Sequence, residues 1–346
     1  MSKQDWELHR IAGEPHEIGR RLGELARPVF DGYMQQSAAW HDVRKWRGHA
    51  FVQRLRDAAR AHCPEQLAEL DGIAMGLGWS ADDIFLWNCR GELVHNTPDG
   101  CTTFAAAGAD HTLIAHNEDG DPFLLGKGWL VEVRPNGKPG FVSFYDPGSL
   151  PGHTFAVNRA GLVQAINNLR ISQSAAGVPR MLLARAVLDA GTLDEAVERL
   201  ADTPRASGFH HTLGAAGDRR VLSVEATAMR CSVERVARVS GHANHMIHRG
   251  CGGEAQIVTD SSRDRQARVE ALLQLHDARI DGDLLVDMLH DKAPAGLPIY
   301  RDDPNDPDGE NTLATALFHI RDEGVALQVR AQRAVVFETF VARATA

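Results

Sequence analysis

The first hundred residues have the apolar periodicity of amphipathic helices. Between residues 14 and 34, apolar side chains recur every three or four positions, which places them on one helical face: Ile18, Leu22, Leu25, Val29, Phe30 and Tyr33. The stretch PEQLAELDGIAMGL predicts a second helix that begins at Pro64 and stops near Gly78. Ser80, with Asp83 three residues later, begins a third helix in the manner of a capping box.

From residue 101 onward the pattern changes to short apolar runs rich in Thr, Val, Ile and Phe. These runs predict strands at TTFAAAG, TLIAHN, WLVEVRP, FVSFY, TFAVN and GLVQAIN. Asn136-Gly137 is a strong hairpin signal between two of them. Strands this close in sequence must pair mostly antiparallel, because parallel pairing needs a long crossover.

Helices and strands alternate again in the second half of the chain. Helices are predicted at residues 179–202, with Thr192 as an N-cap, and at about 262–277, begun by Ser261 or Ser262. Further strands are predicted at HHTLGAA, RVLSVEAT, CSVERV, GVALQVRA and AVVFETFV. This order of elements predicts an α+β fold in which helices cover antiparallel sheets.

The composition indicates which kinds of partner the protein has and in which compartment it works. The net charge of −9 leaves no basic surplus to attract phosphate backbones, which argues against nucleic acid. No apolar run is long enough to cross a bilayer and the first residues show no apolar signal region, so we expect no membrane partner and a cytoplasmic location. The odd number of cysteines, five, with no C-x-x-C pair, predicts free thiols.

The sequence Gly-Cys-Thr-Thr at residues 100–103 stands where the helical pattern gives way to strands. A cysteine that opens a strand after glycine, a residue that tolerates strained backbone, is suited to self-cleavage. The Cys101 thiol would attack the Gly100 carbonyl, and hydrolysis of the thioester would expose an α-amino group on Cys101. That amine, with an ordinary pKa of about 7.7–8.0, can serve as general base for its own thiol. On this dipeptide alone, a buried core cysteine is the commoner alternative.

Several blocks together carry a family resemblance. They read GEPHEIGRRLGE, CPEQLAELDGIAMGLG, DIFLWNCRGEL, DGCTTFAA, TLIAHNEDGD, NRAGLVQAINNL, LSVEAT and GHANHM. In this order they resemble the acyl-coenzyme A:6-aminopenicillanic acid acyltransferase family, a branch of the N-terminal-nucleophile hydrolases that includes β-alanyl-amine hydrolases. The resemblance implies a four-layer αββα fold. It also implies self-cleavage into an α chain of residues 1–100 and a β chain of residues 101–346, one integrated domain.

The resemblance assigns roles to three residues. Cys101 matches the nucleophile. Asp119, in HNED, matches a carboxylate on the hairpin partner of the nucleophile strand, which can hold and orient the Cys101 ammonium. Asn244, in GHANHM, matches the oxyanion-hole asparagine, a donor whose loss typically costs roughly 100- to 1000-fold in rate. From residue type alone, Asp119 is also a candidate solvated turn residue and Asn244 a strand-end amide.

Other polar and aromatic residues are candidate substrate contacts: Asn117, Asn167, Phe209, His210 and Arg263. The GFHH sequence at 208–211 departs from the family, so no relative's substrate is carried over. Phe209 and His210 have packing as an alternative role, and Arg263 a solvated helix face. The segment RDDPNDPDGEN at 301–311 lacks the full spacing of a calcium loop, and we predict an exposed acidic loop.

The predicted enzyme is a cysteine amidohydrolase or acyltransferase that cleaves a small-molecule amide through an acyl-thioester on Cys101. We expect no metal and no cofactor, with a coenzyme A thioester left open as an acyl donor. One alternative is a metal-dependent hydrolase using His242, His245 and His248, although HANHMI reads as a strand, which separates these side chains. The other is a non-catalytic scaffold. Neither alternative has a reason to break the chain at Gly100.

Overall fold

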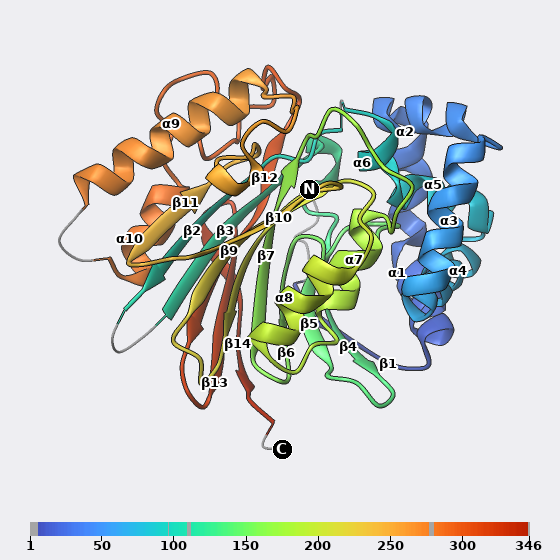
Figure 1. Ribbon diagram of the computed structural model, residues 1–346, viewed down its shortest axis with the longest axis horizontal. Helices are drawn as coiled ribbons and strands as arrows, with labels where there is room; N and C mark the ends of the chain where they lie inside the picture. Colours follow the sequence, from blue (N-terminus) through green and yellow to red (C-terminus); the bar gives the residue numbers. More distant parts are fainter. Residues whose placement is uncertain (1–5, 96, 109–111, 277–279, 345–346) are drawn as a thin grey trace.

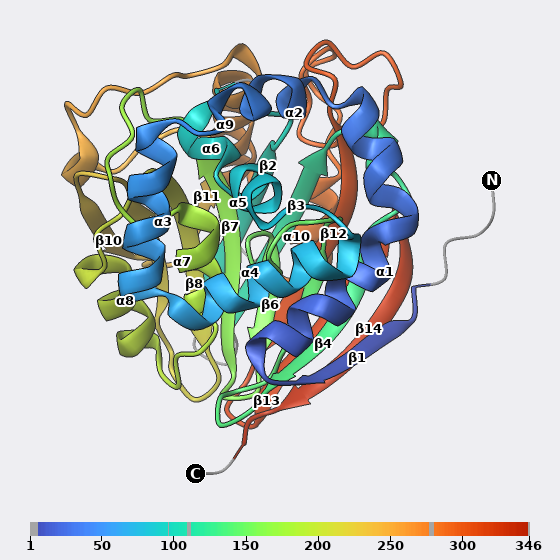
Figure 2. The same ribbon diagram turned by 90° about the vertical axis from the view of Figure 1, so that its right-hand side faces the viewer.

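The computed structural model describes residues 6–95, 97–108, 112–276 and 280–344. Two sheets pack face to face, and helices cover the outer side of each, which gives four layers in the order α, β, β, α (Figures 1 and 2). The larger sheet has the strand order β1-β4-β5-β6-β7-β8-β9-β10, and the smaller has the order β11-β2-β3-β12-β13-β14. The predicted α+β sandwich is confirmed.

The strands of both sheets are mostly antiparallel neighbours. The larger sheet contains β1 (Leu8–Gly13), β4 (Trp129–Pro135), β5 (Phe141–Tyr145), β6 (Phe155–Asn158), β7 (Leu162–Leu169), β8 (Gly208–Ala215), β9 (Val221–Ala226) and β10 (Cys231–Arg235). The smaller contains β11 (Val239–His242), β2 (Cys101–Ala107), β3 (Thr112–Gly120), β12 (Asn311–Ile320), β13 (Gly324–Ala331) and β14 (Ala334–Ala342). Within the described ranges, β1 with β4 is the one parallel pair of strands in these sheets.

The helices form two outer groups (Figure 1). On the side of the larger sheet lie α1 (Pro15–Gln36), α2 (Ala38–Val43), α3 (Ala50–His62), α4 (Pro64–Leu77), α5 (Ala81–Asn88), α6 (Arg90–Leu93), α7 (Arg180–Val187) and α8 (Leu193–Asp202). On the other side, α9 (Asp260–Leu275) contacts β11, and α10 (Gly282–Leu289) contacts β2, β3 and β12.

Capping residues place the ends of the predicted N-terminal helices. Helix α4 begins at Pro64, and Gly78 follows it in the left-handed conformation, with φ of 79°. The Ser80 hydroxyl accepts a hydrogen bond from the Asp83 N–H at the start of α5. The observed helix ends agree with the predicted ones because capping depends on residues close to the helix end in sequence.

The start of α9 differs from the prediction. Thr259, and not Ser261 or Ser262, is the N-cap, since its hydroxyl accepts the Ser262 N–H at 3.1 Å. Both serines therefore lie in the first turn. Residue 277, where the sequence ended this helix, lies outside the described residues, as does Asn96 in the turn-prone stretch before Cys101.

The elements missing from the sequence prediction include β1, α3, α10 and β12. Strand β1 pairs with β4, more than a hundred residues away, so nothing local distinguishes it from the helices that follow. Strand β12 is buried along most of both faces, and it therefore lacks the alternation of polar and apolar residues that identifies a half-exposed strand. Its place beside β3 supplies a wall of the candidate site described below.

Helices α1 and α4 cross at very short distance. A Cβ atom added at Gly19 would lie 1.8 Å from the Glu69 carbonyl oxygen, and one at Gly76 would lie 2.0 Å from the Arg20 carbonyl oxygen. Only glycine permits this approach, which buries the apolar face of α1, including Ile18 and Leu22. Among the described residues, no helix is long and apolar enough to cross a membrane.

A buried acid on α6 should make stability depend on pH. Glu92 Oε1 accepts the Arg180 N–H at 2.9 Å, and burial, opposed by Arg180, raises the pKa of Glu92 from 4.5 to about 7. The folded chain then binds more protons than the unfolded chain between these values, so stability falls as pH rises through this window. Glu92→Gln, which resembles the protonated acid, should remove this fall and stabilise the protein at pH 8 by about 1–3 kcal/mol.

Urea unfolding at pH 5 and pH 8 measures this effect. Exposed Glu198→Gln is the control and should follow the wild-type protein at both values. An equal loss of stability with pH in wild type and Glu92→Gln would contradict the assignment.

Candidate active site

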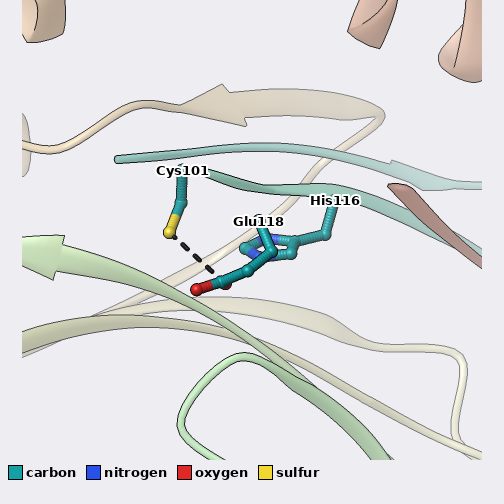
Figure 3. Close-up of side chains that lie close together, drawn as sticks. All are labelled: Cys101, His116 and Glu118. Atoms are coloured by element: carbon teal, nitrogen blue, oxygen red, sulfur yellow. Dashed lines mark hydrogen bonds and ion pairs between the residues drawn. The ribbon is translucent and has the colours of Figure 1, made fainter. Parts of the chain in front are cut away.

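Cys101 is the first residue of β2, and its side chain points between the two sheets. It is 4% exposed, and its partner across the β2–β3 hairpin is Glu118. The Cys101 Sγ atom lies 3.7 Å from Glu118 Oε2 (Figure 3). The backbone of Cys101 is held on both sides, because its N–H donates to Asn244 Oδ1 at 2.9 Å and its carbonyl accepts from Arg265 at 2.5 Å.

Gly100 is closely surrounded in the uncut chain. Its carbonyl oxygen accepts the Asp119 N–H at 2.9 Å. A Cβ atom at residue 100 would lie 2.4 Å from Glu310 Oε2, so a larger residue would displace that carboxyl group. Gly100 is not among the described glycines with positive φ. The prediction that glycine is needed here for strained backbone is therefore wrong, and the requirement comes from close packing.

Asp119 lies near the end of β3, the hairpin partner of the strand that begins with Cys101. Its Oδ1 atom accepts the Thr312 hydroxyl at 2.7 Å, while Oδ2 is buried without a hydrogen-bond partner in the described residues. Burial raises the pKa of Asp119, and Arg265 and Arg301 oppose this shift. The unpaired oxygen leaves one acceptor open to a cation or donor arriving in the pocket.

Asn244 is buried directly beside Cys101, and it follows β11 rather than lying within it. The strand ends at His242, so the strand-like interpretation of HANHMI is wrong beyond that residue. The Asn244 Oδ1 atom accepts from Cys101 N–H and from Arg265 at 2.7 Å. Its Nδ2 donates to the Asn168 carbonyl at 3.2 Å. In the uncut chain, then, the oxygen and not the nitrogen of this amide faces the Cys101 backbone.

Arg265 is a central residue that the sequence analysis missed. Its fully buried guanidinium contacts the Cys101 carbonyl, Thr102 Oγ1, Ser261 Oγ and Asn244 Oδ1. A signal was available, since Arg265 lies four residues after Ser261 and four before buried Val269, and i, i+4 residues share a helical face.

The pocket next to Cys101 lies at the end of β2 and β3 and is lined by residues from both halves of the chain. Its walls include Glu118 and Asp119 from the hairpin, Asp99 two residues before Cys101, and Asp146, Asn168 and Phe209 from the larger sheet and its loops. Four of these are carboxylic acids. Burial, with Glu118 and Asp119 next, raises the pKa of the Cys101 thiol far above its ordinary value, so the thiol is protonated at neutral pH.

Of the five candidate substrate contacts, Phe209 lines this pocket and the other four do not. Asn117 donates to the Leu289 carbonyl on the side of α10. Asn167 and His210 lie between the sheets, where His210 stacks on the His242 ring. Arg263 is on the exposed face of α9 and pairs with Asp260.

The histidines at 242–248 do not converge. His242 contacts Glu225 at 3.1 Å, His245 contacts Ser262 at 2.8 Å, and His248 contacts Ser223 at 2.8 Å. Within the part of the chain that the structure describes, one set of three side chains brings potential ligand atoms within 4.8 Å of one another: Cys101, His116 and Glu118 (Figure 3). A metal hydrolase built on the three histidines has no support in this geometry.

The 301–311 loop is acidic and most of its residues are exposed, as predicted, but Arg301, Asp306 and Glu310 are buried. Arg301 is 1% exposed and binds Asp306 at 2.5 Å and Glu310 at 2.8 Å. The prediction of an exposed acidic loop is wrong for these residues. The loop carboxylates surround a buried cation, and this pairing holds Glu310 against Gly100.

A comparison with protein families decides the identity of the chain. The family model described as "Acyl-coenzyme A:6-aminopenicillanic acid acyl-transferase" matches residues 106–334, well over half of the sequence. The chain belongs to this family. As a member of this family, the protein is an enzyme that hydrolyses amide bonds or transfers acyl groups. The match includes Asp119 and Asn244 and begins five residues after Cys101.

Solved structures similar to this acyltransferase-family chain include two altered forms of conjugated bile acid hydrolase from Clostridium perfringens. One, a mutant, has 11% sequence identity and a TM-score of 0.45, over 69% of this chain and 92% of that chain. The other, a variant at a different position, has 10% identity and a TM-score of 0.36, over 72% and 86%. A search of curated protein sequences gave no match.

Proposed function

We propose that the protein is a precursor that cuts itself between Gly100 and Cys101 and then hydrolyses a small-molecule amide with Cys101 as N-terminal nucleophile. One observation carries the proposal. The Gly100–Cys101 peptide opens β2 beside a pocket, with its carbonyl oxygen bound by the Asp119 N–H and the Asp119 side chain holding one unpaired oxygen.

The first reaction is an acyl shift. Cys101 Sγ attacks the Gly100 carbonyl carbon, and the Asp119 N–H donates to the developing oxyanion. The carbon–nitrogen bond breaks, the thiol proton ends on the Cys101 nitrogen, and Gly100 is held as a thioester. Water then hydrolyses the thioester and leaves the α chain, residues 1–100, and the β chain, residues 101–346, as a heterodimer.

The second reaction uses the new α-amino group. This amine removes the thiol proton as Sγ attacks the substrate carbonyl, and Asp119 Oδ2 accepts a hydrogen bond from the resulting ammonium. Asn244 donates to the substrate oxyanion from Nδ2, which in the uncut chain is bound to the Asn168 carbonyl. Loss of the amine product leaves an acyl-thioester on Cys101, which water resolves. No cofactor is required, and a coenzyme A thioester stays an alternative acyl donor.

Intact mass measurement of the purified wild-type chain tests the proposal. Two masses that correspond to residues 1–100 and 101–346 support it, and incubation with an amide substrate should add the acyl mass to the β chain. A single uncut mass after prolonged incubation at neutral pH, with no acyl adduct, would contradict both reactions.

Asp119→Asn should separate the two reactions. The backbone N–H of residue 119 is retained, so self-cleavage should continue, whereas the ammonium loses its carboxylate partner. We expect amide hydrolysis to fall by about 100-fold or more, the usual size of a proton-transfer contribution. Asp121→Asn, just after β3 and outside the pocket lining, is the control and should hydrolyse at the wild-type rate. Equal rates for Asp119→Asn and wild type would rule out this role.

A further inference from the structure

Three potential ligand atoms meet beside the nucleophile. Glu118 Oε2 lies 3.7 Å from Cys101 Sγ and 3.2 Å from His116 Nε2, and all three atoms are within 4.8 Å of one another. The corners of a zinc tetrahedron with sulfur, nitrogen and oxygen ligands are about 3.3–3.5 Å apart, given bonds of about 2.0–2.3 Å. The distances from Glu118 Oε2 to the other two atoms are therefore already close to those that one zinc ion needs, and the three side chains lie next to one another (Figure 3).

The hydrogen bonds behind His116 determine which ring nitrogen carries the proton. Asn167 must present its NH₂ group to the His242 carbonyl, 3.1 Å away, because a carbonyl oxygen can only accept. Asn167 Oδ1 then accepts the one proton of the Thr103 hydroxyl at 2.7 Å. His116 Nδ1, 2.8 Å from the same hydroxyl, must therefore be the donor to it.

A neutral His116 with its proton on Nδ1 has a bare lone pair on Nε2. That lone pair is the one directed at Glu118. A histidine that binds a metal through one nitrogen while the other donates to a fixed partner is the usual arrangement of a metal ligand and its support.

Charge balance favours a divalent cation with affinity for sulfur. Cys101 and Glu118 bind a metal as thiolate and carboxylate, so each gives up one proton when the ion binds. A divalent ion would displace the two protons, and the thiolate and carboxylate would neutralise it in a buried site. Sulfur, imidazole and carboxylate together suit Zn²⁺, whereas Mg²⁺ and Ca²⁺ prefer oxygen ligands alone.

We propose that Cys101, His116 and Glu118 form an inhibitory Zn²⁺ site that switches the nucleophile off reversibly. Cys101 and Glu118 both line the pocket, so an ion that enters the pocket can reach them. Bound Zn²⁺ occupies the sulfur that must attack a carbonyl, and it therefore blocks self-cleavage and turnover alike. The inhibitory effect rests on the proposed function, whereas binding of the ion does not.

Titration of the chelator-treated full chain with Co²⁺, a spectroscopic substitute for Zn²⁺, tests the site. We expect one equivalent to bind with a sulfur-to-cobalt charge-transfer band, and Zn²⁺ to displace it. His116→Asn, which keeps a donor near Thr103 but lacks Nε2, should bind at least about 100-fold more weakly, and Thr103→Val about 10- to 100-fold more weakly. Cys101→Ser should lose the band, and Cys231→Ser, at a half-buried thiol elsewhere, should keep it.

Alkylation supplies a measurement that does not depend on how the variants fold. In the wild-type chain, one equivalent of Zn²⁺ should slow carboxymethylation of Cys101 by at least about 10-fold, and a chelator should restore the rate. The proposal is overturned if no thiolate band appears, because the cluster then holds protons only, or if the band survives in Cys101→Ser. If the metal site exists but the proposed function is wrong, the charge-transfer band will form, and the chain will remain uncut both with and without chelator.

Discussion

The Cys101→Ala chain should remain a single polypeptide of 346 residues and hydrolyse no amide. Alanine retains the backbone of β2 and its hydrogen bonds to Asn244 and Arg265 but removes the sulfur atom that we propose attacks the Gly100 carbonyl. Without that attack no α-amino group forms, so both the nucleophile and its base are lost. Activity should fall below about one thousandth of the wild-type value, as for other removals of a nucleophile.

Intact mass and an amide-hydrolysis assay on the same preparations check this result. Cys251→Ala is a matched control. Cys251 is also buried, but it belongs to the segment that connects β11 to α9 in the sequence, and it is not among the residues that line the pocket. It should be cut and active like the wild-type chain. A cut and active Cys101→Ala chain would end the assignment of Cys101 as nucleophile.

Arg265→Met should produce the largest loss of stability among the substitutions considered. The buried guanidinium donates to the Cys101 carbonyl and to Asn244, and its charge is close to Asp119 and Glu310. Methionine fills much of the volume but removes the donor to the Cys101 carbonyl and the charge beside Asp119 and Glu310, and breaking a buried ionic network in this way typically costs about 3–5 kcal/mol. Self-cleavage should also slow sharply, because the Cys101 backbone and the Asn244 amide lose their common anchor.

Arg263→Met, two residues earlier on the same helix, is the control. Arg263 pairs with Asp260 at the surface, and such pairs contribute about 0–1 kcal/mol. Urea unfolding and the rate of appearance of the 101–346 fragment measure both effects. Equal stability and equal cleavage in the two variants would show that Arg265 does not organise the site.

The difference between these two arginines shows where sequence reasoning stopped. From the sequence, Arg263 is a candidate substrate contact, with a solvated helix face as its alternative, and no role is assigned to Arg265. Helical spacing alone could have separated the two positions, but a buried arginine contradicts the usual preference of charged residues for solvent. The Cys101 carbonyl of β2, the Asp119 carboxylate of β3 and the Glu310 carboxylate just before β12 make burial of Arg265 favourable.

The sequence by itself determined the features that depend on neighbouring residues. Caps and apolar spacing located α1, α4 and α5, alternating runs located most strands, and the family resemblance singled out Cys101, Asp119 and Asn244. Phe209 was also a sequence candidate, and it lies on the pocket wall. These signals depend on neighbouring residues or on short sequence motifs, so they can be identified without knowledge of the fold.

The tertiary structure alone decided what surrounds Cys101. The register of β2 against β3 places Glu118 opposite Cys101, and β12, which the sequence did not predict, brings Thr312 to Asp119. The orientation of the Asn244 amide and the position of Glu310 against Gly100 also come from segments more than a hundred residues apart. Such contacts follow from sheet pairing and layer packing, and no local pattern in the chain encodes them.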